Sequence, residues 1–127
     1  MEPVVNRVAV IPVRTPTLPP ATHTNTWIVG EDALTVVDPA SPYPDEQERL
    51  FRALEAEIED GRTVRRLFLT HHHQDHVSGA TDLQRRLAER GVQVPIAAHP
   101  VTRDLVADHI LVEELVGAGT VPGRQAL

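Results

Sequence analysis

Four of the seven histidines in this 127-residue chain lie within six residues, in the run Thr70-His71-His72-His73-Gln74-Asp75-His76. The run directly follows Val64–Thr70, an apolar stretch with the pattern of a strand. Imidazoles rarely gather in one place unless they share a ligand. The fold must therefore place the end of this strand where several of these side chains can converge.

The absence of cysteine narrows the chemistry of such a cluster. Disulfides, thiolate metal sites and cysteine nucleophiles are all excluded, so any metal is held by His, Asp or Glu. Imidazole and carboxylate suit Zn²⁺, and they also suit Fe²⁺ or Mn²⁺. A metal held in this way lowers the pKa of bound water toward about 7 and polarises a carbonyl or phosphoryl oxygen. These residue types therefore indicate hydrolysis.

The backbone conformation of the run decides which side chains meet. An extended backbone alternates them, so that His71, His73 and Asp75 converge and His72 points away. A helix would instead bring His72 and His76 together, as in the H-E-x-x-H motif, but this sequence lacks the glutamate of that motif. A solvated polar loop without metal is a third interpretation. We expect the extended geometry.

Strand-like and helix-like segments alternate along the whole chain, which predicts one layered α/β domain over residues 1–127. The N-terminal run Val4–Val13 is rich in β-branched residues and predicts one strand. Helical spacing predicts a helix from Asp45 to Asp60, with Asp45 and Glu48 as a capping pair. Other predicted elements are a hairpin formed by Asn25–Val29 and Leu34–Val37, strands at Val64–Thr70 and Val94–Ala98, a helix at Ala80–Ala88, and a short helix after Pro100.

Composition limits the partners and the location. Twelve basic against eighteen acidic residues give a net charge of -6, which does not favour nucleic acid and favours a small-molecule substrate. The two arginine groups, residues 62–66 and 85–90, are expected to be solvated faces. With neither a signal-peptide pattern nor an apolar window long enough for a membrane span, we expect no membrane association and a cytoplasmic protein. Trp27 and Tyr43 are expected to be packing or rim residues.

The run from Thr70 to His76 resembles the T-H-x-H-x-D-H signature of the metallo-β-lactamase superfamily. The flanking sequence is similar as well, in the early strand Asn25–Val29, the strand ending Val36-Val37-Asp38-Pro39, the helix start Val77-Ser78-Gly79-Ala80, and His99-Pro100. The greatest similarity is to the subgroup of glyoxalase II-like thioesterases and β-lactamase-like protein 2 endoribonucleases.

The resemblance implies an αββα sandwich, of which this chain would supply about the N-terminal half, a mixed sheet with helices. It implies that His71 and His73 ligate a first metal and that Asp75 and His76 ligate a second. Asp75 would also orient the water, the catalytic role. Asp38 would hydrogen-bond to the site from outside the ligand shell, or it is only a turn residue before proline. The implied reaction is attack of metal-bound hydroxide on an ester, thioester, amide or phosphodiester.

The chain departs from the family in length, since family domains supply further ligands from a second half. His99 is expected to be a strand-end residue and His109 a helix-surface residue. Two ligands for each metal are too few for a tight site. The first hypothesis is a metal-dependent hydrolase, and the second is a catalytically incomplete metal-binding or interaction module. Because a half sandwich exposes one sheet face, we expect a homo-oligomer.

Overall fold

The computed structural model describes residues 2–5, 8–16 and 22–117. The strands of this part form one seven-stranded sheet, in which the order of the strands follows their order in the chain. They are β1 (Glu2–Val5), β2 (Val8–Arg14), β3 (His23–Val29), β4 (Ala33–Val37), β5 (Thr63–Leu69), β6 (Ile96–Ala98) and β7 (Glu114–Leu115). The helices are α1 (Pro44–Glu59), α2 (Gln74–Val77), α3 (Ala80–Glu89) and α4 (Pro100–Val106).

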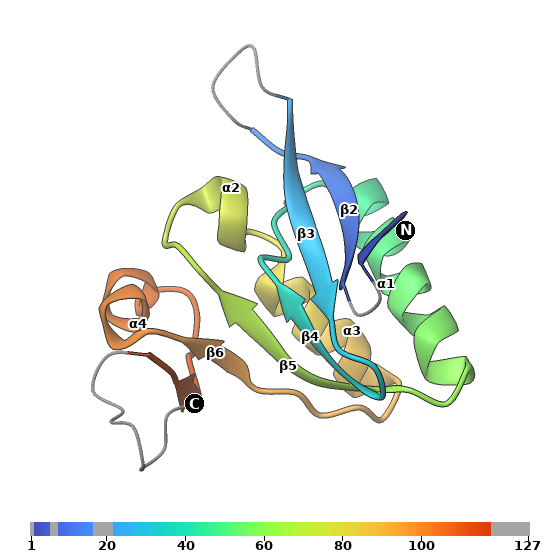
Figure 1. The fold of residues 1–127 in the computed structure, drawn as a ribbon. Coiled ribbons are helices and arrows are strands. Elements are labelled where there is room, and N and C mark those ends of the chain that lie inside the picture. Colours follow the sequence, from blue (N-terminus) through green and yellow to red (C-terminus); the bar gives the residue numbers. More distant parts are fainter. Residues whose placement is uncertain (1, 6–7, 17–21, 118–127) are drawn as a thin grey trace.

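The sheet is mixed. Strands β1 to β4 pair antiparallel, whereas β4 to β7 pair parallel, because a helical segment separates each strand from the next after β4. Helices α1 and α3 lie behind the sheet in Figure 1. The predicted α/β class with a mixed sheet is confirmed, and α1 and α3 form a layer of helices against this sheet.

The hydrophobic core lies between the sheet and these two helices. The sheet contributes a row of cross-strand neighbours, Ile28, Val36 and Leu67, each at most 4% exposed. Leu54 of α1 and Leu87 of α3 pack into the same cluster and are fully buried. Burial of each such side chain stabilises the fold by about 1.5–3 kcal/mol. This packing holds the strand ends that carry the site.

Two predicted elements differ from the observed ones. The predicted strand Val4–Val13 is divided into β1 and β2, which pair antiparallel on either side of the polar pair Asn6-Arg7. The capping pair predicted for α1 is wrong, since the N-cap is Tyr43 and no side chain caps the helix. Pro44 at the first helical position makes that cap less necessary, because it has no N–H to satisfy.

The predicted hairpin is confirmed, with β3 and β4 joined by a turn that starts at Gly30. Gly30 adopts a φ of 127°. A side chain there would collide with the Ala33 carbonyl oxygen at 2.2 Å, so only glycine fits this turn. In the described part of the chain, no helix is long and apolar enough to span a membrane.

Candidate metal site

The site forms where two parallel strands end side by side. Strands β4 and β5 run in the same direction, and Val37 lies opposite Phe68 near their carboxyl ends. The Asp38 N–H extends this pairing by donating a hydrogen bond to the Phe68 carbonyl oxygen over 2.8 Å. Because both strands end at the same edge of the sheet, Asp38 and the start of the histidine run meet there although they are distant in sequence.

Asp38 is the buried residue that connects the other side chains of the site. It is 4% exposed, and it is the one non-glycine residue with a positive φ, 54°, within the described ranges. Asp tolerates this left-handed conformation better than most residues, although it remains unfavourable. The Thr26 hydroxyl donates a hydrogen bond to the Asp38 carbonyl oxygen over 2.8 Å and so helps to hold the conformation. A strained backbone of this kind is typical of a functional position.

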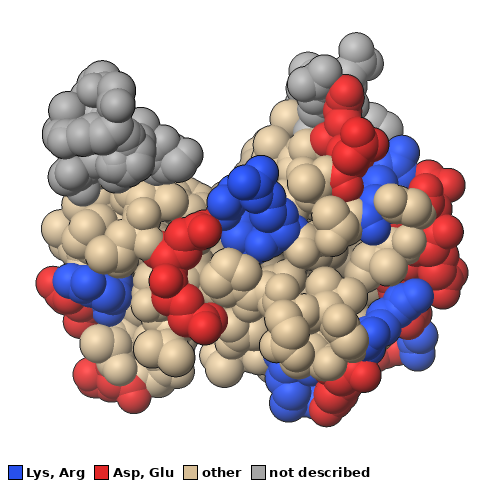
Figure 2. Space-filling model, turned by 90° about the horizontal axis from the view of Figure 1, so that it is seen from below, with Lys and Arg blue, Asp and Glu red and all other residues tan. Residues whose placement is uncertain are grey.

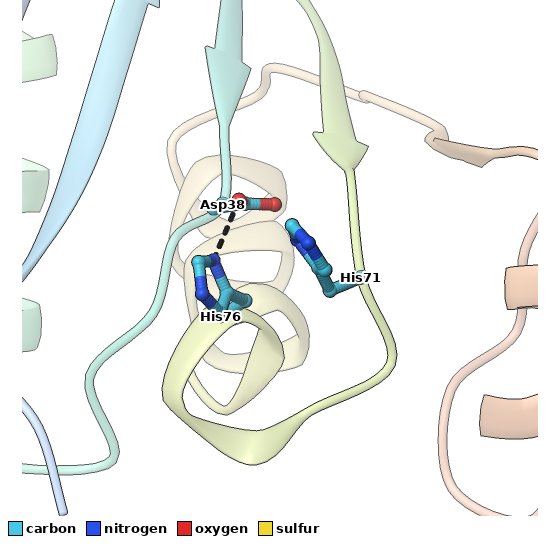
Figure 3. Close-up of side chains that lie close together, drawn as sticks. All are labelled: Asp38, His71 and His76. Carbon is cyan, nitrogen blue, oxygen red and sulfur yellow. Dashed lines mark hydrogen bonds and ion pairs between the residues drawn. The ribbon is translucent and has the colours of Figure 1, made fainter. Parts of the chain in front are cut away.

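The Asp38 carboxylate accepts three hydrogen bonds from the residues around the histidine run. The Thr70 N–H donates to Oδ1 over 2.8 Å, and the Thr70 hydroxyl donates to Oδ2 over 2.5 Å. His76 Nδ1 lies 2.9 Å from the same Oδ2 (Figure 3). Both oxygens are therefore engaged, which fixes the orientation of the carboxylate.

These contacts determine the tautomers of two histidines. A carboxylate only accepts hydrogen bonds, so in neutral His76 the proton is on Nδ1 and the lone pair is on Nε2. The Thr70 hydroxyl donates its one proton to Asp38, so it must accept from His71 Nδ1, which lies 2.7 Å away. In both rings Nε2 is therefore the nitrogen able to bind a metal. A carboxylate that fixes histidine ligands in this way is typical of metal centres.

Helix α2 carries His76 and is anchored by its neighbours. Val77 is 2% exposed and packs into the core. The Gly79 N–H donates to the Pro39 carbonyl oxygen over 2.8 Å, which ties the end of α2 to the loop after Asp38. A Cβ at position 79 would lie 2.7 Å from the Pro39 oxygen and 2.8 Å from the Ser41 oxygen. Glycine is thus required where these two segments approach each other.

The structure brings together two of the four predicted ligands. One potential ligand atom from each of His71, His76 and Asp38 lies within 4.8 Å of the other two, and Figure 3 shows these side chains converging. The exposed His73 ring is stacked against the His71 ring, with 6.0 Å between centroids and an interplanar angle of 16°. The side chain of Asp75 lies outside the described part of the structure.

The extended geometry predicted for the run is wrong. The backbone bends at residues 72 and 73 and then enters α2, with the His76 N–H donating to the His73 carbonyl oxygen over 2.9 Å. The exposed His72 ring lies 4.4 Å from that of His73, instead of on the opposite side. The cause is the helical turn, which ends the alternation that a strand would impose.

The two remaining histidines of the described C-terminal part do not join the cluster. His99 follows β6, as predicted, and its Nδ1 accepts a hydrogen bond from the Val101 N–H over 3.0 Å as the N-cap of α4. His109 was predicted on a helix surface, but it lies in a turn beyond the end of α4. It lines a cavity of about 190 Å³ together with Val77 and Ile110.

Thr70 is the residue of the candidate site that the sequence did not predict. Its N–H and hydroxyl donate to Asp38, and the same hydroxyl accepts from His71, whereas the sequence marks Thr70 only as the first residue of the motif. The signal available in the sequence was its position, directly between the apolar strand and the first histidine.

Comparison with known proteins identifies the family of the chain. The sequence profile described as the metallo-beta-lactamase superfamily matches residues 19–124, so the chain belongs to this superfamily. No curated protein matches the chain. Similar solved structures include a beta-lactamase domain protein from Burkholderia ambifaria, with 17% identity and a TM-score of 0.74, covering 94% of this chain and 43% of that one.

Two further solved structures share the fold. A metallo-beta-lactamase from Pontibacter korlensis has 16% identity and a TM-score of 0.66, covering 94% of this chain and 52% of that one. A metallo beta lactamase from Hirschia baltica has 20% identity and a TM-score of 0.54, covering 90% and 47%. The chain thus spans about half the length of the solved structures that it matches. The predicted half of a sandwich agrees with this coverage.

Proposed function

We propose that this chain carries the N-terminal part of the active site of a metal-dependent hydrolase. The observation that supports it most is the shared carboxylate of Asp38, which contacts His76 directly and reaches His71 through Thr70. A solvated polar loop would not need a buried, strained aspartate that fixes the tautomers of two histidines. Superfamily membership supports the same reaction class.

The proposed ligands are His71 and His73 for a first ion and Asp75 and His76 for a second, with Zn²⁺ as the first choice and Fe or Mn as alternatives. The donor set fits, because imidazole nitrogen and carboxylate oxygen suit these ions. Such an ion, when bound, would lower the pKa of a water ligand and polarise the group under attack. Asp75 is proposed to orient that water, and Asp38 to fix the imidazoles from outside the ligand shell.

The proposed substrate is a small molecule with an ester, thioester, amide or phosphodiester bond. Nucleic acid is less well supported, because several arginines are already engaged in ion pairs with acidic side chains. Arg86, for example, contacts Asp82 over 2.8 Å and Glu48 over 2.6 Å. Arg62 contacts Glu57 over 3.1 Å and also pairs with Asp60. Guanidinium groups neutralised in this way contribute little to binding phosphates.

A second candidate function is a metal-binding or interaction module without turnover. The observation that favours it is the small donor cluster of the described residues, which contains two of the proposed ligands, His71 and His76. Stable zinc sites use about three or four protein donors, and catalytic sites also keep an open position.

Metal content and turnover distinguish the two candidates. The chain would be purified without a histidine tag and its metal measured by elemental analysis, then assayed with ester, thioester and phosphodiester substrates with and without a chelator. One or two equivalents of metal with chelator-sensitive turnover would support the hydrolase. Bound metal without turnover on any substrate would support the module. A protein without metal affinity would contradict both.

A further inference from the structure

A cavity of about 190 Å³ lies between the end of α2, the start of α3 and the turn that follows α4. Its lining consists of Val77, Ser78, Thr81, His109 and Ile110. Val77 and Ile110 are its apolar walls, and both belong to the hydrophobic core, with 2% and 4% of their surface exposed. Because this core packs between the sheet and the helices, the cavity lies on the helix side of the sheet.

The polar groups of this lining are two hydroxyls and one imidazole. Ser78 and Thr81 provide the hydroxyls, and His109 provides the imidazole from the turn after α4. The His109 N–H donates a hydrogen bond to the Val106 carbonyl oxygen over 3.1 Å, which holds this turn in place. None of the described lining residues carries a carboxylate. Apolar walls with a few polar groups are typical of small-molecule sites.

Size and donor set limit the ligand. The volume exceeds the roughly 10–15 Å³ that one water molecule needs, and it is below the roughly 300 Å³ of the smallest drug-sized pockets. A metal cation would find one imidazole where a zinc site uses about three or four protein donors. Hydroxyls and imidazole each donate a hydrogen bond, and an oxyanion only accepts them. We propose that this cavity binds a small oxyanion, a carboxylate or a phosphate, through Ser78, Thr81 and His109.

The acidic side chains next to the lining residues in the sequence do little to repel such a ligand. Asp82, in the first turn of α3, pairs with Arg85 over 2.6 Å and with Arg86 over 2.8 Å. Asp108, in the turn after α4, is exposed, so water and salt screen its charge. The chain has a net charge of -6, yet acidic and basic side chains are intermixed along one side of the molecule in Figure 2. A small anion therefore meets little like-charge repulsion.

Helix α2 contributes to both the cavity and the metal site. The His76 side chain contacts Asp38, and the next two residues, Val77 and Ser78, line the cavity. If the proposed function holds, on which this step rests, the reaction itself supplies such a ligand. Hydrolysis of an ester, thioester or amide releases a carboxylate, and hydrolysis of a phosphodiester releases a phosphate monoester. The cavity ligand thus belongs to the chemical class of the proposed products.

Titration of the metal-free chain tests the site. Metal is removed with a chelator and then by dialysis, and amide and imidazole NMR resonances are recorded as inorganic phosphate or acetate replaces chloride at constant ionic strength. We expect saturable shifts at Ser78, Thr81 and His109, with a Kd in the millimolar range. The two probes show whether phosphate or carboxylate is preferred. No saturable shift with either anion, or shifts confined to residues 71–76, would overturn the proposal.

Substitutions locate the bound anion. His109→Ala and Thr81→Val should each weaken binding about tenfold, because each removes one hydrogen bond to a charged acceptor. Both side chains are exposed, so neither change disturbs the core. His23→Ala is the matched control, because His23 is an exposed histidine on β3, outside the cavity lining. Unchanged binding in both cavity variants, or an equal loss in His23→Ala, would overturn the proposal.

The same titration separates this site from the proposed hydrolase. It is performed without metal, so its outcome does not depend on turnover. A chain that binds phosphate or acetate at the cavity but hydrolyses no substrate would contradict the proposed function alone. Chelator-sensitive turnover in a chain that binds neither anion would contradict the cavity site alone.

Discussion

Thr70 engages both oxygens of the Asp38 carboxylate, through its N–H at 2.8 Å and its hydroxyl at 2.5 Å. The same hydroxyl accepts from Nδ1 of His71 at 2.7 Å. One threonine therefore forms a relay of hydrogen bonds between a buried acid and the imidazole of His71. The first prediction tests this relay.

Thr70→Val should weaken Zn²⁺ affinity by about 10- to 100-fold, the usual effect of removing a partner behind a metal ligand. Valine keeps the shape of the side chain but leaves Nδ1 of His71 without its acceptor, so the imidazole loses its fixed tautomer. The measurement is zinc titration against a chromophoric chelator. Thr70→Ser retains the hydroxyl and should bind nearly as the wild type does. Equal affinity in the valine variant and the wild type would contradict the relay.

Replacement of single histidines should separate ligands from neighbours. His71→Ala and His76→Ala each remove a group of the three-residue cluster, so the bound zinc per chain should fall close to zero. His72→Ala serves as the control, since this ring is exposed and contacts His73 rather than Asp38. The zinc bound to each variant is measured by elemental analysis after dialysis against trace zinc. Equal losses in all three variants would rule out this assignment.

Gly79→Ala should lower the free energy of unfolding by about 1–3 kcal/mol, because the new Cβ meets two backbone carbonyl oxygens that cannot move independently. It should also weaken zinc binding, since the loop after Asp38 and helix α2 would be forced apart. Urea unfolding and zinc titration measure the two effects. Gly91→Ala is the control, because a Cβ there meets no atom within 4 Å and only the φ of 91° is unfavourable. Unchanged zinc affinity in Gly79→Ala would show that this close approach does not position the site.

Glu46 predicts a pH dependence of stability. Burial raises the pKa of this carboxyl, but hydrogen bonds from the Arg49 side chain and the Arg14 N–H outweigh burial and hold the pKa below its usual value. The unfolded chain therefore binds the proton more readily. The stabilisation is complete above the unfolded pKa of about 4.3 and is lost as the pH falls through the lower pKa of the folded state.

Glu46→Gln should accordingly cost about 1–3 kcal/mol of stability at neutral pH, and the difference from the wild type should shrink at strongly acidic pH. Urea unfolding of the variant and the wild type at neutral and at strongly acidic pH measures this difference in stability. Glu59→Gln is the control, because the Glu59 side chain is 66% exposed and lies 3.6 Å from Arg90. A cost for Glu46→Gln that stays constant with pH would mean that its charge does not stabilise the fold.

Much of the fold follows from local patterns in the sequence. The apolar spacing of α1 and α3 and the glycine turn of the hairpin act over a few residues, so their predicted positions agree with the structure to within a few residues. Strand β7 pairs only two residues with β6, and such a short element has no recognisable periodicity. The division into β1 and β2 depends on pairing between strands, which a single apolar run does not reveal.

The site was predictable in its residue types but not in its geometry. The histidine run identified His71 and His76, and the family pattern pointed to Asp38. The bend at residues 72 and 73 was not predicted, because imidazole has no strong preference between strand and helix. The role of Thr70 depends on the parallel pairing of β4 and β5, a contact between residues 32 positions apart. No local pattern encodes such a contact.

The strands lie in the sheet in the same order in which a ribosome produces them. Domains begin to fold from the N-terminus during synthesis. Each new strand can therefore add to the edge left by its predecessor without waiting for a later segment to fill a gap. The described hydrogen-bond partners of Asp38 are Thr26, Phe68, Thr70 and His76, all of which are synthesised before α3. We expect the nascent chain to assemble this cluster while β6, α4 and β7 are still being made.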